Sequence, residues 1–169
     1  MRRLCLILLC GLIAVPAALA AVGSTGDGVL ELQNVNGVVV VTGSRGTLWG
    51  QMDKGKLVVT DPNLNDGQIF VSGADHTIVR DENVTVYSGA DIHFRVTGGK
   101  YRLAFVGSGI DLTAVGVGTA QLSGDLLADD PGVFAIDSGK AIPVPYSPAK
   151  RFVQFGVQAT TVGGPSQTP

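Results

Sequence analysis

Residues 28–61 read GVLELQNVNGVVVVTGSRGTLWGQMDKGKLVVTD. The stretch holds two copies of one unit: Gly, eight residues, Gly, four residues, Ser or Thr, then Gly or Asp. The first copy starts at Gly28 and the second at Gly46. A third copy starts at Gly109, in GIDLTAVGVGTAQLSG. Recurring glycines between short apolar runs are typical of repeated β-strands joined by corners.

The rest of the chain has the same character, and no run with sustained helical periodicity follows residue 20. Alternation predicts that Ile92, Phe94 and Val96 share one face of a strand. The wholly apolar run Val38–Val41 is expected to be covered on both faces. Thirteen strands are predicted: Val29–Leu32, Val38–Val41, Thr47–Met52, Lys56–Thr60, Gln68–Ser72, Thr77–Val79, Val84–Ser88, Ile92–Thr97, Tyr101–Val106, Ile110–Val115, Thr119–Ser123, Val133–Asp137 and Phe152–Val157.

The strands predict an all-β fold. The 18-residue offset between the first two units favours a short β-solenoid, in which successive rungs bury the same row of side chains. The spacing of later Ser/Thr-Gly marks varies, so an antiparallel β-sandwich is the alternative. Pro143, Pro145 and Pro148 predict an irregular C-terminal part.

The N-terminus carries the pattern of a secretory signal peptide. Arg2 and Arg3 precede an apolar run, and Ala18-Leu19-Ala20 offers small residues for cleavage after Ala20. We therefore expect a secreted, extracellular or cell-envelope protein with a signal peptide at 1–20, one all-β domain at 21–159 and a flexible tail at 160–169. Cleavage removes both cysteines, Cys5 and Cys10, and the apolar run is too short for a membrane span.

The net charge argues against two classes of partner. The 149 residues after position 20 keep 10 Lys and Arg against 14 Asp and Glu, a net charge of −4. A mildly acidic chain without a basic run argues against nucleic acid and against an anionic membrane as partners.

Two segments resemble known domains. Residues 30–48 (LELQNVNGVVVVTGSRGTL) and 108–124 (SGIDLTAVGVGTAQLSG) resemble rungs of the adhesin-like β-solenoid domains of bacterial envelope proteins. The matching positions are Asn34, Asn36, Gly37, Thr42, Gly43 and Ser44. Residues 46–61 are also similar to a bactofilin rung, and the layout resembles small secreted proteins of high-GC Gram-positive bacteria. The resemblance implies an adhesin-like binding or structural module, as an envelope component or self-associating through a sheet edge.

Candidate binding residues are few. Trp49 is the sole tryptophan, and with Tyr87, Tyr101 and Tyr146 it could line a carbohydrate-binding strip; alternatively it belongs to the core. Calcium is a second possibility, because Asp61, Asn63, Asn65 and Asp66 cluster oxygen ligands. The residues at EF-hand positions six and twelve, Asp66 and Ser72, break that motif, so a polar turn is the alternative.

Catalytic and cofactor motifs are not found. His76 and His93 come without cysteines, and a zinc site needs three or four ligands. Ser108 lies in Gly-Ser-Gly, which lacks the flanks of a nucleophile elbow. The sequence therefore predicts a non-catalytic binding module without a cofactor, with a hydrolase as the less favoured reading.

Overall fold

A computed structural model describes residues 26–63 and 65–156. These residues form one open, largely antiparallel β-sheet and no helix, which confirms the all-β prediction. The predicted signal peptide, the tail from residue 160 and the end of the last predicted strand, Val157, lie outside the described residues. The strands are β1 (Gly28–Thr60), β2 (Gly67–Ser72), β3 (His76–Asp81), β4 (Val84–Gly98), β5 (Tyr101–Gly124), β6 (Val133–Ile136), β7 (Ile142–Pro143) and β8 (Arg151–Phe155).

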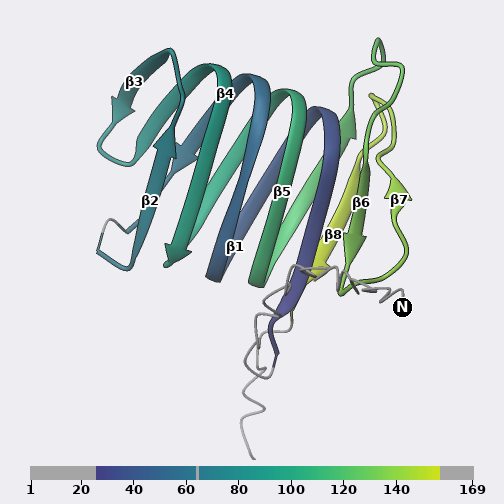
Figure 1. The fold of residues 1–169 in the computed structure, drawn as a ribbon. Helices are drawn as coiled ribbons and strands as arrows, with labels where there is room; N and C mark the ends of the chain where they lie inside the picture. The colour runs from purple at the N-terminus through teal and green to yellow at the C-terminus, as the bar shows by residue number, and fades with distance from the viewer. Residues whose placement is uncertain (1–25, 64, 157–169) are drawn as a thin grey trace, which may run out of the picture.

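The two longest strands, β1 and β5, curve around each other in successive bends (Figure 1). One segment of β5 is hydrogen-bonded on both sides by β1, so that Gly116 pairs with both Gly28 and Gly46. One segment of β1 is likewise flanked on both sides by β5, and Gly37 pairs with both Gly107 and Gly124. Four predicted strands of the opening stretch are therefore one continuous strand, whose register with β5 shifts at the bends.

The bends divide the paired segments into two layers, which we name after Trp49 and Tyr101. In spatial order, the Trp49 layer contains β6, residues 28–35 of β1, 110–116 of β5, 46–52 of β1, 92–98 of β4, and β2. The Tyr101 layer contains β8, residues 118–124 of β5, 37–43 of β1, 101–107 of β5, 55–60 of β1, 84–88 of β4, and β3.

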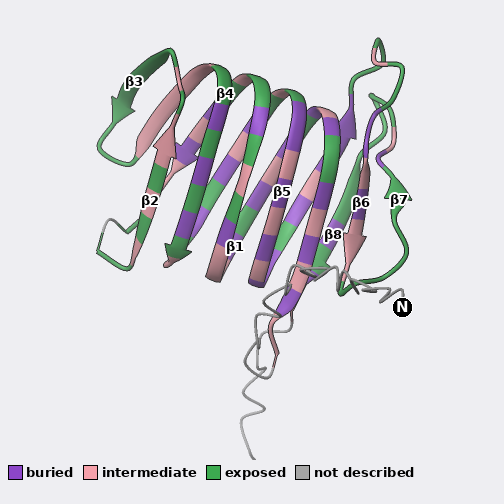
Figure 2. Cartoon of the chain, viewed as in Figure 1, coloured by how far each residue is buried: buried purple, intermediate pink, exposed green. Residues whose placement is uncertain are grey.

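The core lies between the two layers. Phe94 of the Trp49 layer and Phe105 of the Tyr101 layer contact each other, with ring centroids 4.7 Å apart. Alternate residues face this core, so buried and exposed bands follow one another along β1 and β5 (Figure 2). The predicted alternation of Ile92, Phe94 and Val96 is confirmed, since all three are buried. Val38 corrects one expectation, because it is 38% exposed and its strand is covered on one face only.

Glycines occupy the bends because the strands come too close there for a side chain. Gly46 has φ of +123°, and a Cβ on it would collide with the carbonyl oxygen of Val115. In β5 the glycines that pair with glycines of β1 are Gly107, Gly116, Gly118 and Gly124. Of the glycines that define the third sequence unit, Gly118 and Gly124 take part in these pairs, whereas its first glycine, Gly109, has no partner in the ladder with β1.

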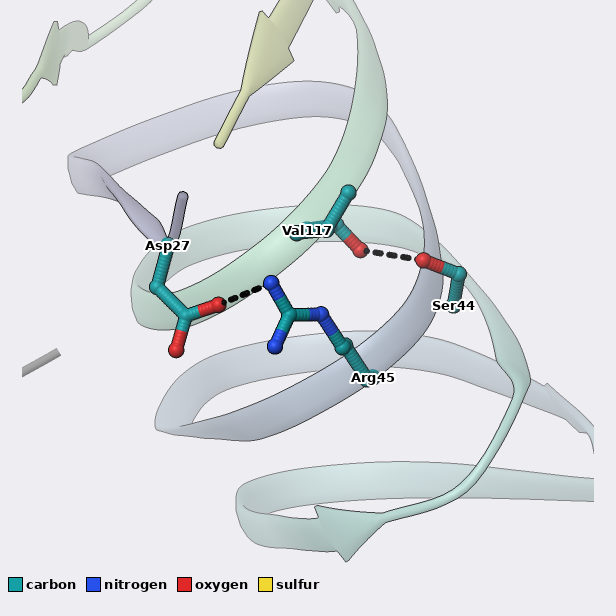
Figure 3. A network of polar contacts seen from close by, with 4 residues as sticks. All are labelled: Asp27, Ser44, Arg45 and Val117. Atoms are coloured by element: carbon teal, nitrogen blue, oxygen red, sulfur yellow. Dashed lines mark hydrogen bonds and ion pairs between the residues drawn. The ribbon is translucent and has the colours of Figure 1, made fainter. Parts of the chain in front are cut away.

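Polar contacts hold the bends of β1 in place (Figure 3). Ser44 donates from Oγ to the carbonyl oxygen of Val117, at 3.1 Å. The guanidinium of Arg45 forms an ion pair of 2.8 Å with Asp27, which precedes the first segment of β1. The first contact connects the bend of β1 at Ser44 to β5, and the second connects that bend to the residue directly before β1.

Asn36, one of the residues on which the adhesin-like resemblance rests, joins three parts of the chain. Its Nδ2 donates to the carbonyl oxygens of Asn34 and Asp130, and its Oδ1 accepts from the backbone N–H of Gly109. Its backbone also bonds to Pro131 and Asp125. The motif residue Asn36 therefore attaches the irregular segment 125–150 to the long strands.

The two ends of the layers differ. At one end, segment 125–150 with β6, β7 and β8 covers the core, and Phe134, Val144 and Phe155 are each 1% exposed. At the other end, β2 and β3 are edge strands that pair with β4 alone. None of residues 65–91 is buried, and β3 is exposed throughout (Figure 2).

Candidate ligand-binding face

Trp49 lies on the outer surface of the Trp49 layer with 42% of its area exposed. Leu48 on the preceding position is buried, so the alternation of the strand turns the indole away from the core. Thr113 of β5 and Arg95 of β4 are its direct partners on the two neighbouring segments. Residues directly opposite in a ladder project to the same face, which places Thr113, Trp49 and Arg95 in one row.

The row continues to the edge of the layer. Arg95 also pairs with Phe70 of β2, which is 67% exposed. Arg95 therefore lies in register between two exposed aromatic residues, Trp49 and Phe70. A guanidinium next to aromatic rings combines hydrogen-bond donors with flat apolar surface.

A second, polar row lies two residues further along the strands. Gln51 pairs there with His93 on one side and Asp111 on the other. One carboxylate oxygen of Asp111 accepts a 2.7 Å hydrogen bond from the backbone N–H of Asn34. Nε2 of His93 lies 3.2 Å from Oδ1 of Asp91. These contacts limit the freedom of two of the three side chains in the row.

An open hollow of about 990 Å³ lies over both rows. The backbone of Gly50 lines part of this hollow. A side chain at this position would collide with the carbonyl oxygen of Asp111. Its size is at the upper end of the range for small-molecule sites. Its lining includes Trp49, Gln51, His93, Arg95, Asp111 and Thr113.

The other predicted aromatic residues do not join Trp49. Tyr101 is 2% exposed and belongs to the core, where burial raises the pKa of its phenol to about 12 because the phenolate would lose its hydration. Tyr87 is half-buried and packs against the core. The strip of Trp49, Tyr87 and Tyr101 expected from the sequence is therefore not formed, and Thr113 and Arg95 flank Trp49 instead.

The loop considered for calcium uses its oxygens within the protein. Asp61 Oδ1 accepts from the backbone N–H of Asn63 at 3.0 Å, an Asx turn. Asn65 donates from its backbone N–H toward Asn63 Oδ1 at 3.5 Å. The carboxylate of Asp66 faces the backbone N–H of Lys100, at 3.3 Å from both oxygens.

Within 26–63 and 65–156, no group of three or more His, Cys, Asp and Glu side chains is placed to hold a metal ion. His76 lies in edge strand β3, and His93 lies in the β4 segment of the Trp49 layer. Ser108 is exposed near a bend and pairs with Lys54.

A second hollow, of about 700 Å³, lies on the Tyr101 layer. It is lined by threonines 42, 60 and 119, with Arg102 and Gln154 beside them. Tyr101 also borders it but is buried, so this hollow offers hydroxyl groups without an exposed aromatic ring. The Trp49 face combines both kinds of group and is the stronger candidate.

Comparison of the chain with protein-family models, with curated proteins and with solved structures gives no match. In the part of the chain that the structure describes, no helix is long and apolar enough to cross a membrane.

Sequence reasoning found Trp49 but missed Arg95 and Phe70 as its neighbours. Alternation does predict that Arg95 faces outward, opposite to Phe94. The pairing of Arg95 with Trp49, 46 positions apart in the chain, depends on the register between β1 and β4. No local sequence pattern predicts the register between these two strands.

Proposed function

We propose that this protein is a secreted, non-catalytic, adhesin-like binding module and that it binds carbohydrate through the Trp49 face. The observation that carries the proposal is the exposed indole of Trp49, held in register between Thr113 and Arg95 on a paired sheet. An indole offers a flat apolar surface on which the C–H groups of a sugar ring stack. Because the strand is paired on both sides, little ordering is needed when a ligand binds.

The polar side chains around Trp49 fit the hydroxyl groups of a sugar. The amide of Gln51 both donates and accepts, Arg95 donates, and Asp111 accepts. Charges of both signs are present, which favours a mainly neutral saccharide over a strongly charged polymer. Hydroxyl-rich ligands need several such groups, and the lining of the hollow contains all three.

A binding role is favoured over hydrolysis by the carboxylates present. Glycoside hydrolysis commonly uses two carboxyl groups across the scissile bond. Of the described residues that line the hollow, Asp111 is the one carboxylate, and it accepts a hydrogen bond from the backbone of Asn34.

We class the scaffold as a short β-solenoid in which two antiparallel strands wind together. The support for this class is the register, in which positions 18 apart in β1, Gly28 and Gly46, pair with the same Gly116. The sandwich alternative shares the two face-to-face layers but joins separate strands by hairpins. Secretion rests on residues 1–20, and intact-mass analysis of protein from the culture medium tests it, with Ala21 as the expected first residue.

Co-sedimentation with insoluble cellulose, chitin and purified bacterial peptidoglycan tests carbohydrate binding. We expect the protein to sediment with at least one of these polymers and Trp49→Ala to remain in the supernatant. Phe152→Ala is the matched control, because Phe152 is an exposed aromatic residue of the Tyr101 layer. Failure to bind any polymer, or equal binding by both variants, overturns the proposal.

A further inference from the structure

The open end of the molecule, formed by β2 and β3, leaves part of the core uncovered. Ile69, Val71, Ala74 and Tyr87 pack against the core there but stay only half-buried. At the opposite end, segment 125–150 covers Phe134 and Val144 almost completely. A core that is closed at one end and open at the other indicates that something covers the open end.

β2 lacks the features that keep edge strands apart. Its sequence, Gly67–Ser72 (GQIFVS), has no charged residue and no proline. Its ladder with β4 is regular, whereas the ladder of β3 is interrupted between Val79 and Asp81. Native edge strands are commonly protected by charges, prolines or bulges. β2 therefore presents unpaired backbone groups beside an exposed Phe70.

We propose that the open end binds a second copy of this chain through antiparallel pairing of β2 with β2 of the other copy. The sequence of β2 is complementary to itself about Phe70. A two-fold axis at Phe70 places Phe70 opposite Phe70, Ile69 opposite Val71 and Gln68 opposite Ser72. Phe70 is outer-facing, whereas Ile69 and Val71 face the core, so each pair matches in the face it occupies.

The same two-fold axis limits the assembly to two copies. A two-fold interface uses the same patch on both copies and is completed by one pairing, so it yields a dimer and not a filament. The half-buried residues Ile69 and Val71 of both copies then extend one core across the interface. The absence of charge in β2 suits this occupant, because like charges would otherwise be directly opposed.

Charge substitution at Phe70 tests the pairing. Phe70 is 67% exposed, so Phe70→Lys and Phe70→Glu are expected to fold. Each variant alone opposes two like charges across the axis and is expected to be monomeric. Phe152→Lys is the matched control, since Phe152 is 71% exposed at the covered end and is expected to leave the dimer intact.

Sedimentation equilibrium of the purified protein over a wide concentration range gives the readout. We expect a twofold mass for the wild type, the monomer mass for each Phe70 variant, and recovery of the dimer when Phe70→Lys and Phe70→Glu are mixed. A wild type that is monomeric at every concentration, a dimer that survives both substitutions, growth into larger polymers, or no recovery on mixing overturns the proposal. The molecular mass is measured without polysaccharide, so the result is separate from polysaccharide binding.

Discussion

Asp27, directly before β1, and Arg45, 18 residues further along the chain, form an ion pair of 2.8 Å. Each of them directly precedes a glycine, Gly28 or Gly46, that pairs with Gly116 of β5. The ion pair thus connects positions that are equivalent with respect to the ladder. The ion pair can form only if β1 winds so that residues 18 apart lie side by side.

Asp27→Asn should lower the free energy of unfolding by about 0.5–1 kcal/mol, because the Arg45 side chain is 51% exposed and solvent screens part of the attraction. Urea denaturation at low and high salt measures the change, and high salt should reduce it. Glu82→Gln, in the exposed turn after β3, is the control for loss of one negative charge. An Asp27→Asn protein as stable as the wild type at low salt contradicts a role for the pair.

Asn36→Ala should lower the free energy of unfolding by about 1–3 kcal/mol, since the side chain makes three hydrogen bonds that join both long strands and segment 125–150. Loosening of that segment should also accelerate its cleavage by protease. Thermal unfolding and limited proteolysis measure the two effects. Asn83→Ala, an exposed asparagine in the turn before β4, should change neither.

The buried phenol of Tyr101 predicts loss of stability at high pH. Burial raises the pKa of Tyr101 to about 12, above the ordinary value of 10.0. The folded state then retains a proton that the unfolded state releases, so stability is complete below pH 10 and falls between pH 10 and 12 by roughly 1.4 kcal/mol per pH unit.

Tyrosinate absorbance during a pH titration checks this prediction. Of the three tyrosines, Tyr101 should account for the step near pH 12, and Tyr101→Phe should remove it. An unchanged titration curve in Tyr101→Phe contradicts burial of this side chain.

Much of the local structure follows from the sequence, because burial on one face imposes a period of two. Ile92, Phe94 and Val96 illustrate this, and eleven of the thirteen predicted strands lie within observed ones. The other two, Val133–Asp137 and Phe152–Val157, extend beyond the ends of β6 and β8. The joining of those strands does not follow. A glycine such as Gly46 reads as a break between strands, yet the ladder passes through it because the facing Gly116 also lacks a side chain.

In the candidate site, too, the local features follow from the sequence and the long-range pairing does not. Trp49 is visible in the sequence as the single tryptophan, and its exposure follows from its place next to buried Leu48. Tyr101 resembles Trp49 in being aromatic, but the alternation of its strand turns its side chain into the core. Arg95 lies beside Trp49 only because of the register between β1 and β4, and the residues around either position do not specify that register.

Because the chain has one tryptophan, its fluorescence reports on the Trp49 face alone. A titration with a soluble oligosaccharide of the polymer that sediments the protein should give a saturable change in that fluorescence. Arg95→Ala should weaken binding about tenfold, a loss of about 1.4 kcal/mol, while Arg102→Ala on the Tyr101 layer should bind like the wild type. Fluorescence that stays constant while the oligosaccharide binds, or equal affinities of Arg95→Ala and wild type, would contradict binding at the Trp49 face.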